Sequence, residues 1–259
     1  MKFLILTEMD HVAYVKLHRP EMRNAFNPEM ISEIIKTFLD LEKRQDLRAV
    51  VLQGEGKAFC AGGDLNWMKE MVNFSFEQNL QDSTVLFEMF EAIAHCTLPV
   101  IGLVHGAAFG GALGLIAACD EVIAEEGTQF CFSEVKLGIA PAVISAFVMR
   151  KANAGKVRPL MLSASVFNPH IAQQAGLVTE VVGHGEGHTA LQKTLQPYLQ
   201  AGPQAVRETK KLLNNLESLN WKQQKEATAK VIAERRASPE GQEGLRAFLE
   251  KREPSWRST

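Results

Sequence analysis

Two neighbouring glycines, Gly62 and Gly63, form the first segment of the chain whose residue types could do chemistry. They follow a short apolar stretch and stand directly before Asp64, which is well placed to begin a helix. Paired glycines let the backbone turn tightly and leave N–H groups exposed at a helix start. Such groups bind an anion or a developing oxyanion. A Gly-Gly loop is also a common turn, so this pair alone leaves both interpretations open.

A second glycine-rich segment carries Gly106, Gly110, Gly111 and Gly114. Here too an apolar stretch of strand type runs into a helix start, which again would expose backbone N–H groups. The spacing is GxxxGGxxG, whereas a dinucleotide-binding loop has GxGxxG and an acidic residue about twenty positions later. The segment therefore argues against a nucleotide site, and the small residues could also serve close helix packing.

The third segment places one carboxylate, Glu134, between the apolar stretches 129–132 and 135–141. A lone glutamate in such a position is most often a surface residue. If the side chain lay in a cleft, desolvation would raise its pKa and suit it to proton transfer.

Other catalytic patterns are missing from the sequence. It has no GxSxG nucleophile elbow, no HExxH pair and no phosphate-binding P-loop. His184 and His188 are four residues apart, but Gly183, Gly185 and Gly187 favour a loop over a zinc-binding helix face. We therefore expect no metal site.

Alternating strand and helix patterns must position these three segments. The expected strands are 3–6, 12–17, 49–52, 100–104, 121–124, 129–132 and 178–182. Asn27-Pro28, Ser238-Pro239 and Asn168-Pro169 are helix starts, with a capping side chain followed by proline. After about residue 186 the strand patterns cease and consecutive helices follow. The pattern predicts an α/β core with a helical appendage.

Composition narrows the class of protein. The 259 residues are 46% hydrophobic and 22% charged, with a formal net charge of −2 and no basic block, so we expect no nucleic-acid partner. The four cysteines show no metal-ligand spacing and are expected to be reduced and buried. The apolar run after Met1-Lys2 is too short for a signal peptide, and no stretch is long enough to span a membrane. We therefore expect a cytoplasmic protein without membrane association.

In order along the chain, these segments resemble the enoyl-CoA hydratase/isomerase (crotonase) family. The resemblance rests on residues 19–26, 59–64, 106–114, 133–141, 175–178 and 244–251. It implies an α/β, crotonase-like spiral of strand-strand-helix units over residues 1–190. It also implies a C-terminal helical trimerisation region over residues 191–259, and homo-oligomers that are trimers or dimers of trimers.

The resemblance also implies the roles of individual residues. The backbone N–H groups of Gly63 and Gly111 would hold the thioester oxygen of an acyl-CoA, and Glu134 would transfer the proton. The expected substrate contacts are Met22, Arg23, Ala61, Asp64, Leu65, Gly110, Phe248 and Lys251, the last two often reaching the coenzyme A of a neighbouring subunit. No metal or redox cofactor is implied, because coenzyme A enters as part of the substrate.

Gly114 departs from the common hydratase pattern, which has a second glutamate at that position. A single glutamate suits an isomerase that moves a double bond from position 3 to position 2. Residues 108–115, 133–138, 141–145 and 64–69, however, resemble a bacterial branch described as 3-methylglutaconyl-CoA hydratases, in which this glycine is normal. We therefore expect a hydratase acting on a branched or glutaconyl-type 2-enoyl-CoA. The alternatives are the isomerase, a non-catalytic acyl-CoA-binding protein and, more remotely, an RNA-binding protein.

Overall fold

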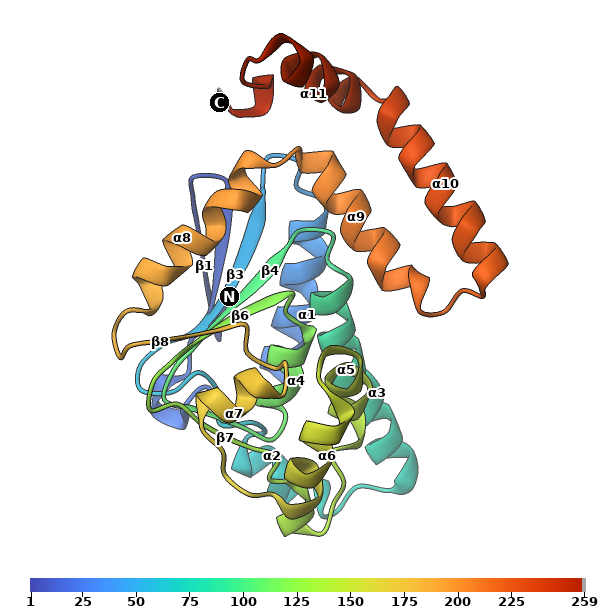
Figure 1. Ribbon diagram of the computed structural model, residues 1–259. Coiled ribbons are helices and arrows are strands. Elements are labelled where there is room, and N and C mark those ends of the chain that lie inside the picture. Colours follow the sequence, from blue (N-terminus) through green and yellow to red (C-terminus); the bar gives the residue numbers. More distant parts are fainter. Residues whose placement is uncertain (258–259) are drawn as a thin grey trace.

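A six-stranded sheet forms the centre of the protein, for which the computed structural model describes residues 1–257 (Figure 1). The strand order is β1-β2-β3-β4-β6-β8, with β1 antiparallel to β2 and every other pair parallel. The strands are β1 (Leu4–Met9), β2 (Val12–Leu17), β3 (Ala49–Gly54), β4 (Val100–Val104), β6 (Glu121–Glu125) and β8 (Glu180–Val182). The expected α/β class is confirmed.

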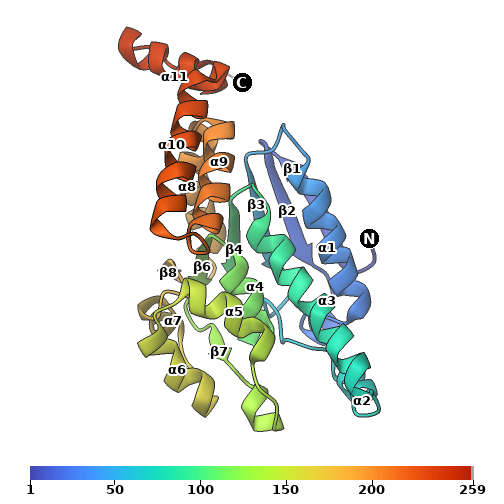
Figure 2. The same ribbon diagram turned by 90° about the vertical axis from the view of Figure 1, so that its right-hand side faces the viewer.

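Both faces of this sheet are covered, as parallel strands require. Ala13, Val15 and Leu17 of β2 point into the larger core, which α1 (Pro28–Glu42) and α3 (Phe76–His95) cover. On the opposite face Val12 packs in a smaller core with Leu191 and other residues of α8 (Gly187–Gln200). Figure 2 shows α1 and α3 on one side of the sheet and α8 on the other.

A second, two-stranded sheet lies at one end of the main sheet and carries the loops of interest. It pairs β5 (Ala107–Phe109) with β7 (Gln129–Cys131) in parallel. Isolated bridges extend it by joining Cys60 to Ala108 and Phe26 to Gly63. The sequence did not indicate β5, because three residues flanked by glycines give no strand periodicity.

Short helices surround this small sheet. They are α2 (Leu65–Met71), α4 (Ala112–Ala118), the 3₁₀ turn η2 (Glu134–Leu137), α5 (Ala142–Lys151), α6 (Ala154–Ser163) and α7 (Pro169–Gln174). Helix α6 was not predicted, since Pro159 lies inside it. The expected caps are confirmed: the side chains of Asn27, Asp64, Asn168 and Ser238 each accept a backbone N–H at the start of a helix.

Three helices end the chain: α9 (Pro203–Leu216), α10 (Trp221–Ala237) and α11 (Pro239–Glu250). No residue of α10 is buried, and α10 and α11 extend away from the sheet (Figures 1 and 2). The division expected at residue 190 falls inside α8, whose Ala190 and Leu191 pack on the sheet. The division into a core over residues 1–190 and an oligomerisation region over residues 191–259 stays a prediction, as does trimerisation through the tail.

Two further observations concern the described part of the chain. The four cysteines are free and buried, as expected. Within residues 1–257 no helix has the length and hydropathy needed to cross a bilayer.

Candidate active site

Three loops meet beside the small sheet, and backbone hydrogen bonds hold them together. The loop after β3 is joined to β5, since the Cys60 N–H donates to Ala107 O at 3.1 Å and the Phe109 N–H donates to Cys60 O at 3.2 Å. The loop after β5 is joined to β7, because the Gly110 N–H donates to Cys131 O at 2.8 Å. The glycine pairs and Glu134 therefore lie at one place, although 72 positions separate Gly62 from Glu134.

Gly62 must be glycine for two reasons. Its φ is +91°, and an added Cβ would lie 2.6 Å from Phe109 O and 3.6 Å from the amide nitrogen of Gly111. The first loop thus comes close to the amide of Gly111, and Gly63 is the next residue along that loop.

The amide N–H groups of Gly63 and Gly111 donate no hydrogen bond to any residue of the described chain, 1–257. The amides of Ala61 and Asp64 in the same loop are used, donating to Arg23 O and Phe26 O. Two unpaired N–H groups on adjacent loops can bind one oxygen atom that gains negative charge. The structure therefore brings together the two amides that were expected to hold a thioester oxygen.

Glu134 begins η2 beside these amides. Its side chain is half-buried, and its Oε2 atom is buried with no hydrogen-bond partner among residues 1–257. Burial raises its pKa above the usual 4.5, and a backbone hydrogen bond opposes part of this rise. An added Cβ on Gly110 would lie 3.6 Å from Glu134 Oε1, so Gly110 separates the carboxylate from Gly111. A desolvated carboxylate at this position can accept and return a proton.

The structure brings some of the expected substrate contacts to this place. Arg23 and Ala61 are neighbours through the hydrogen bond from the Ala61 N–H to Arg23 O, at 2.9 Å. Arg23 is exposed, Met22 is partly exposed beside it, and Leu65 is exposed at the start of α2. Ala61 and Leu65 thus flank Gly63 in the first loop, and Arg23 binds that loop through its backbone oxygen.

Asp64 has its carboxylate engaged within the protein. The side chain is buried, with one oxygen accepting from the Asn66 N–H at 2.7 Å and the other from Arg19 Nη2 at 2.7 Å. Only its place in the loop, and not a free carboxylate, can contribute to a substrate site.

Phe248 and Lys251 lie elsewhere. Both are exposed on α11 or at its end, and Figures 1 and 2 place α11 at the end of the molecule opposite α2. In one chain they do not meet the amides. Their expected contact with coenzyme A stays a prediction about a neighbouring subunit.

Asn24 was missed by the sequence reasoning. It is fully buried with φ +55°, and its Nδ2 donates to the backbone oxygens of Glu55, Ala58 and Phe59. These bonds fix the chain between β3 and the glycine pair. A buried asparagine in left-handed backbone leaves only a weak local signal in a sequence.

Comparison with known proteins agrees with this geometry. The sequence profile of the family described as enoyl-CoA hydratase/isomerase matches residues 7–259. The chain belongs to the enoyl-CoA hydratase/isomerase family. It is an enzyme of that family by sequence, and similar solved structures agree.

Solved crotonase structures superimpose over nearly the whole chain. An enoyl-CoA hydratase from Shewanella pealeana is 39% identical with a TM-score of 0.93, covering 98% of this chain and 96% of that one. Pseudomonas aeruginosa AtuE is 32% identical with a TM-score of 0.95, covering 98% and 99%. The enoyl-CoA hydratase ACTT6 of Alternaria alternata is 31% identical over 207 residues, which are 80% of this chain and 67% of that protein. The crotonase fold is confirmed.

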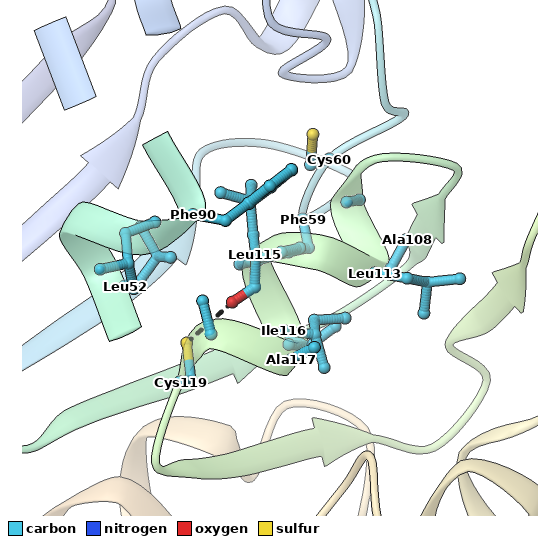
Figure 3. Close-up of a cluster of buried hydrophobic side chains, with 14 of the residues drawn as sticks. Leu52, Phe59, Cys60, Phe90, Ala108, Leu113, Leu115, Ile116, Ala117 and Cys119 are labelled. Atoms are coloured by element: carbon cyan, nitrogen blue, oxygen red, sulfur yellow. Dashed lines mark hydrogen bonds between the residues drawn. The ribbon is translucent and has the colours of Figure 1, made fainter. Parts of the chain in front are cut away.

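Gly114 stands where the resemblance led us to look for a second glutamate. The glycine is buried in α4, and an added Cβ would lie 2.6 Å from Phe90 Cζ and 2.7 Å from Ile144 Cγ2. Figure 3 shows Phe90 reaching from α3 toward Leu115 of α4. Apolar side chains therefore fill the space in which a second glutamate would begin. Among residues 1–257, no three His, Cys, Asp or Glu side chains group as metal ligands.

Proposed function

We propose that this enzyme adds water across the double bond of a 2-enoyl-CoA. The observation that carries the proposal is the meeting of two amides, at Gly63 and Gly111, with the desolvated carboxylate of Glu134. The two amide N–H groups and the Oε2 atom of Glu134 have no hydrogen-bond partner among residues 1–257. The amides would bind the thioester oxygen and stabilise the enolate that forms when water attacks C3. Glu134 would take one proton from that water and deliver a proton to C2, so that hydroxyl and hydrogen both add.

The acyl group is proposed to be branched or of glutaconyl type, such as 3-methylglutaconyl-CoA. The support is the resemblance of residues 64–69, 108–115, 133–138 and 141–145 to hydratases of that kind. With Gly114 enclosed by Phe90 and Ile144, this chain has no second glutamate to hold the water. A carboxylate on the substrate itself could take over that task. Turnover of uncharged crotonyl-CoA at the same rate would contradict this step.

The enclosed Gly114 also favours a second candidate function. A double-bond isomerase needs one base to remove a proton from C2 and return it to C4, and Glu134 alone supplies such a base. The oxyanion-binding amides would serve this reaction equally well.

The test is the loss of enoyl-thioester absorbance on 3-methylglutaconyl-CoA and on crotonyl-CoA. We expect rapid loss on the first substrate and a fall of about 10²–10⁴-fold in Glu134→Gln. Glu70→Gln, an exposed glutamate of α2, is the matched control and should keep full activity. Conversion of a 3-enoyl-CoA to a 2-enoyl-CoA without hydration would establish the isomerase. Binding of acyl-CoA without either reaction would indicate a non-catalytic binding protein.

A further inference from the structure

The indole of Trp67 joins two helices beside the candidate site. Its Nε1–H donates to Asp82 Oδ1 at 3.1 Å, linking α2 to the second turn of α3. Trp67 is buried and Asp82 is half-buried. Burial raises the pKa of Asp82, and the indole hydrogen bond opposes that rise. A bond from a buried ring to a desolvated carboxylate restricts the rotation of the ring.

The opposite edge of the same ring lies against an amide donor. An added Cβ on Gly63 would lie 3.6 Å from Trp67 Cζ3 and 3.7 Å from Trp67 Cε3, ordinary contact distances. The indole thus spans the space from Asp82 to Gly63. Met68 Cε lies nearer to the same position, at 3.1 Å, so the indole forms one part of the surface on which Gly63 rests, and rotation of the ring would remove that part.

Phe26 connects Trp67 with the other amide donor. The centroids of the two rings are 6.3 Å apart at an interplanar angle of 57°. Phe26 Cζ lies 2.5 Å from where a Cβ on Gly111 would be, so the ring contacts that glycine directly. Its backbone also binds the first loop, because the Phe26 N–H donates to Gly62 O at 2.9 Å. One aromatic pair therefore supports both Gly63 and Gly111.

We infer that Asp82 is a positioning residue for the oxyanion-binding amides and acts through Trp67. By holding the indole, it keeps the Trp67–Phe26 pair in place, and this pair sets the separation of the Gly63 and Gly111 N–H groups. The inference rests on the proposed function only in assigning those two amides to the thioester oxygen. It holds equally for hydration and for isomerisation, since both pass through an enolate.

The test uses a probe that reports on the amides without any turnover. The absorption band of 4-dimethylaminocinnamoyl-CoA moves to longer wavelength when its thioester oxygen accepts strong hydrogen bonds. We expect the wild-type protein to shift the band, and Asp82→Leu and Trp67→Phe each to lose at least half of the shift. The double variant should lose no more than either single variant, because both break the same bond.

Conservative and remote variants separate positioning from simple structural support. Asp82→Asn keeps an oxygen that can accept from the indole and should retain the shift. Glu88→Leu, at an exposed position of the same helix, should leave both the shift and the rate unchanged. For Asp82→Leu we expect kcat to fall about tenfold or more, with KM changed less than threefold, as for a small misplacement of catalytic groups.

The outcomes distinguish this inference from the proposed function. A full shift in both Asp82→Leu and Trp67→Phe overturns the inference, whatever happens to their melting temperatures. Wild-type protein that binds the probe without a shift overturns both. A wild-type shift that Asp82→Leu weakens, in a protein that turns over no enoyl-CoA, supports the positioning role and contradicts the proposed function. If Asp82→Leu fails to fold, Trp67→Phe gives the same decision.

Discussion

Phe90 Cζ lies 2.6 Å from where the Cβ of any side chain on Gly114 would be placed. Phe90 is itself held by Phe147, with ring centroids 5.5 Å apart, so it cannot move aside freely. Gly114 is thus enclosed by an aromatic ring, and no open space is left beside it in which a glutamate side chain could stand.

This contact predicts that Gly114→Glu will not restore a two-glutamate site. We expect the variant to lower the free energy of unfolding by at least about 1–3 kcal/mol, as overpacked cores do, and to leave crotonyl-CoA hydration no faster. The measurement combines urea unfolding with the absorbance assay. The companion is the double variant Gly114→Glu with Phe90→Ala, in which the removed ring leaves space for the glutamate and should recover part of the stability. A Gly114→Glu variant as stable as wild type would contradict the close contact between Phe90 and position 114.

The raised pKa of Glu134 predicts how activity depends on pH. Proton transfer begins from the ionised carboxylate, so kcat/KM should fall on the acid side with an apparent pKa above the ordinary 4.5. A pH–rate profile checks this, with intrinsic fluorescence recorded over the same range to show that the protein stays folded. A rate that holds constant down to pH 4.5 would exclude Glu134 as the base.

The same shift predicts a pH-dependent change in stability. The folded protein binds the Glu134 proton more tightly than the unfolded chain does, so this group stabilises the fold below pH 4.5. That contribution is lost as the pH rises through the raised pKa. Glu134→Gln should therefore melt at a higher temperature than wild type at pH 7. The difference in melting temperature between the variant and wild type should shrink as the pH falls toward 4.5. A difference that stays constant would contradict a raised pKa at Glu134.

The buried ion pair between Arg19 and Asp64 predicts a strong effect when one partner is removed. Arg19 Nη2 lies 2.7 Å from Asp64 Oδ2, and the two side chains are only 12% and 3% exposed. Asp64→Asn leaves Arg19 buried without its counter-ion and should cost about 3–5 kcal/mol of unfolding free energy, measured in urea. Arg19→Met with Asp64→Asn should recover part of this loss. No recovery would contradict the view that the unpaired charge of Arg19 causes it.

The ion pair between Arg19 and Asp64 also makes the stability of the fold depend on pH. Burial favours the protonated form of Asp64, but hydrogen bonds from Arg19 and Asn66 outweigh it and hold the pKa below 3.8. The pair therefore stabilises the fold above pH 3.8, and this stability is lost as the pH falls through the lowered pKa. The gap in melting temperature between wild type and Asp64→Asn should narrow in acid.

The hydrogen bonds of Arg207 hold helix α9 against the core, and they predict the effect of replacing this residue. It is buried, and its guanidinium donates to Thr97 Oγ1 at 2.9 Å, to Glu42 O at 3.2 Å and to Arg44 O. Lysine cannot replace these divergent donors, so Arg207→Lys should lower the unfolding free energy by about 3 kcal/mol. Arg158→Lys, at an exposed position, is the control and should change it little. Equal stability of both variants would show that the hydrogen bonds of Arg207 contribute little to holding α9.

The sequence by itself determined the features that depend on near neighbours. Helix starts at Asn27, Asp64 and Ser238 follow from side chains that bond to backbone groups two or three residues ahead. The paired glycines predict a tight turn, and the positive φ of Gly62 agrees with that prediction. The family also follows from the order of such segments, and with it the α/β fold.

Only the tertiary structure decided what depends on residues far apart in the chain. Glu134 reads as a surface residue until β7 and the Gly110 loop bury it and raise its pKa. The bond between Trp67 and Asp82 spans two helices, and no periodic pattern marks it. Phe90 closes the Gly114 site from another helix, and α11 lies far from the two amides. The burial and desolvation of a side chain depend on which distant segments pack against it, and local sequence preferences do not determine that packing.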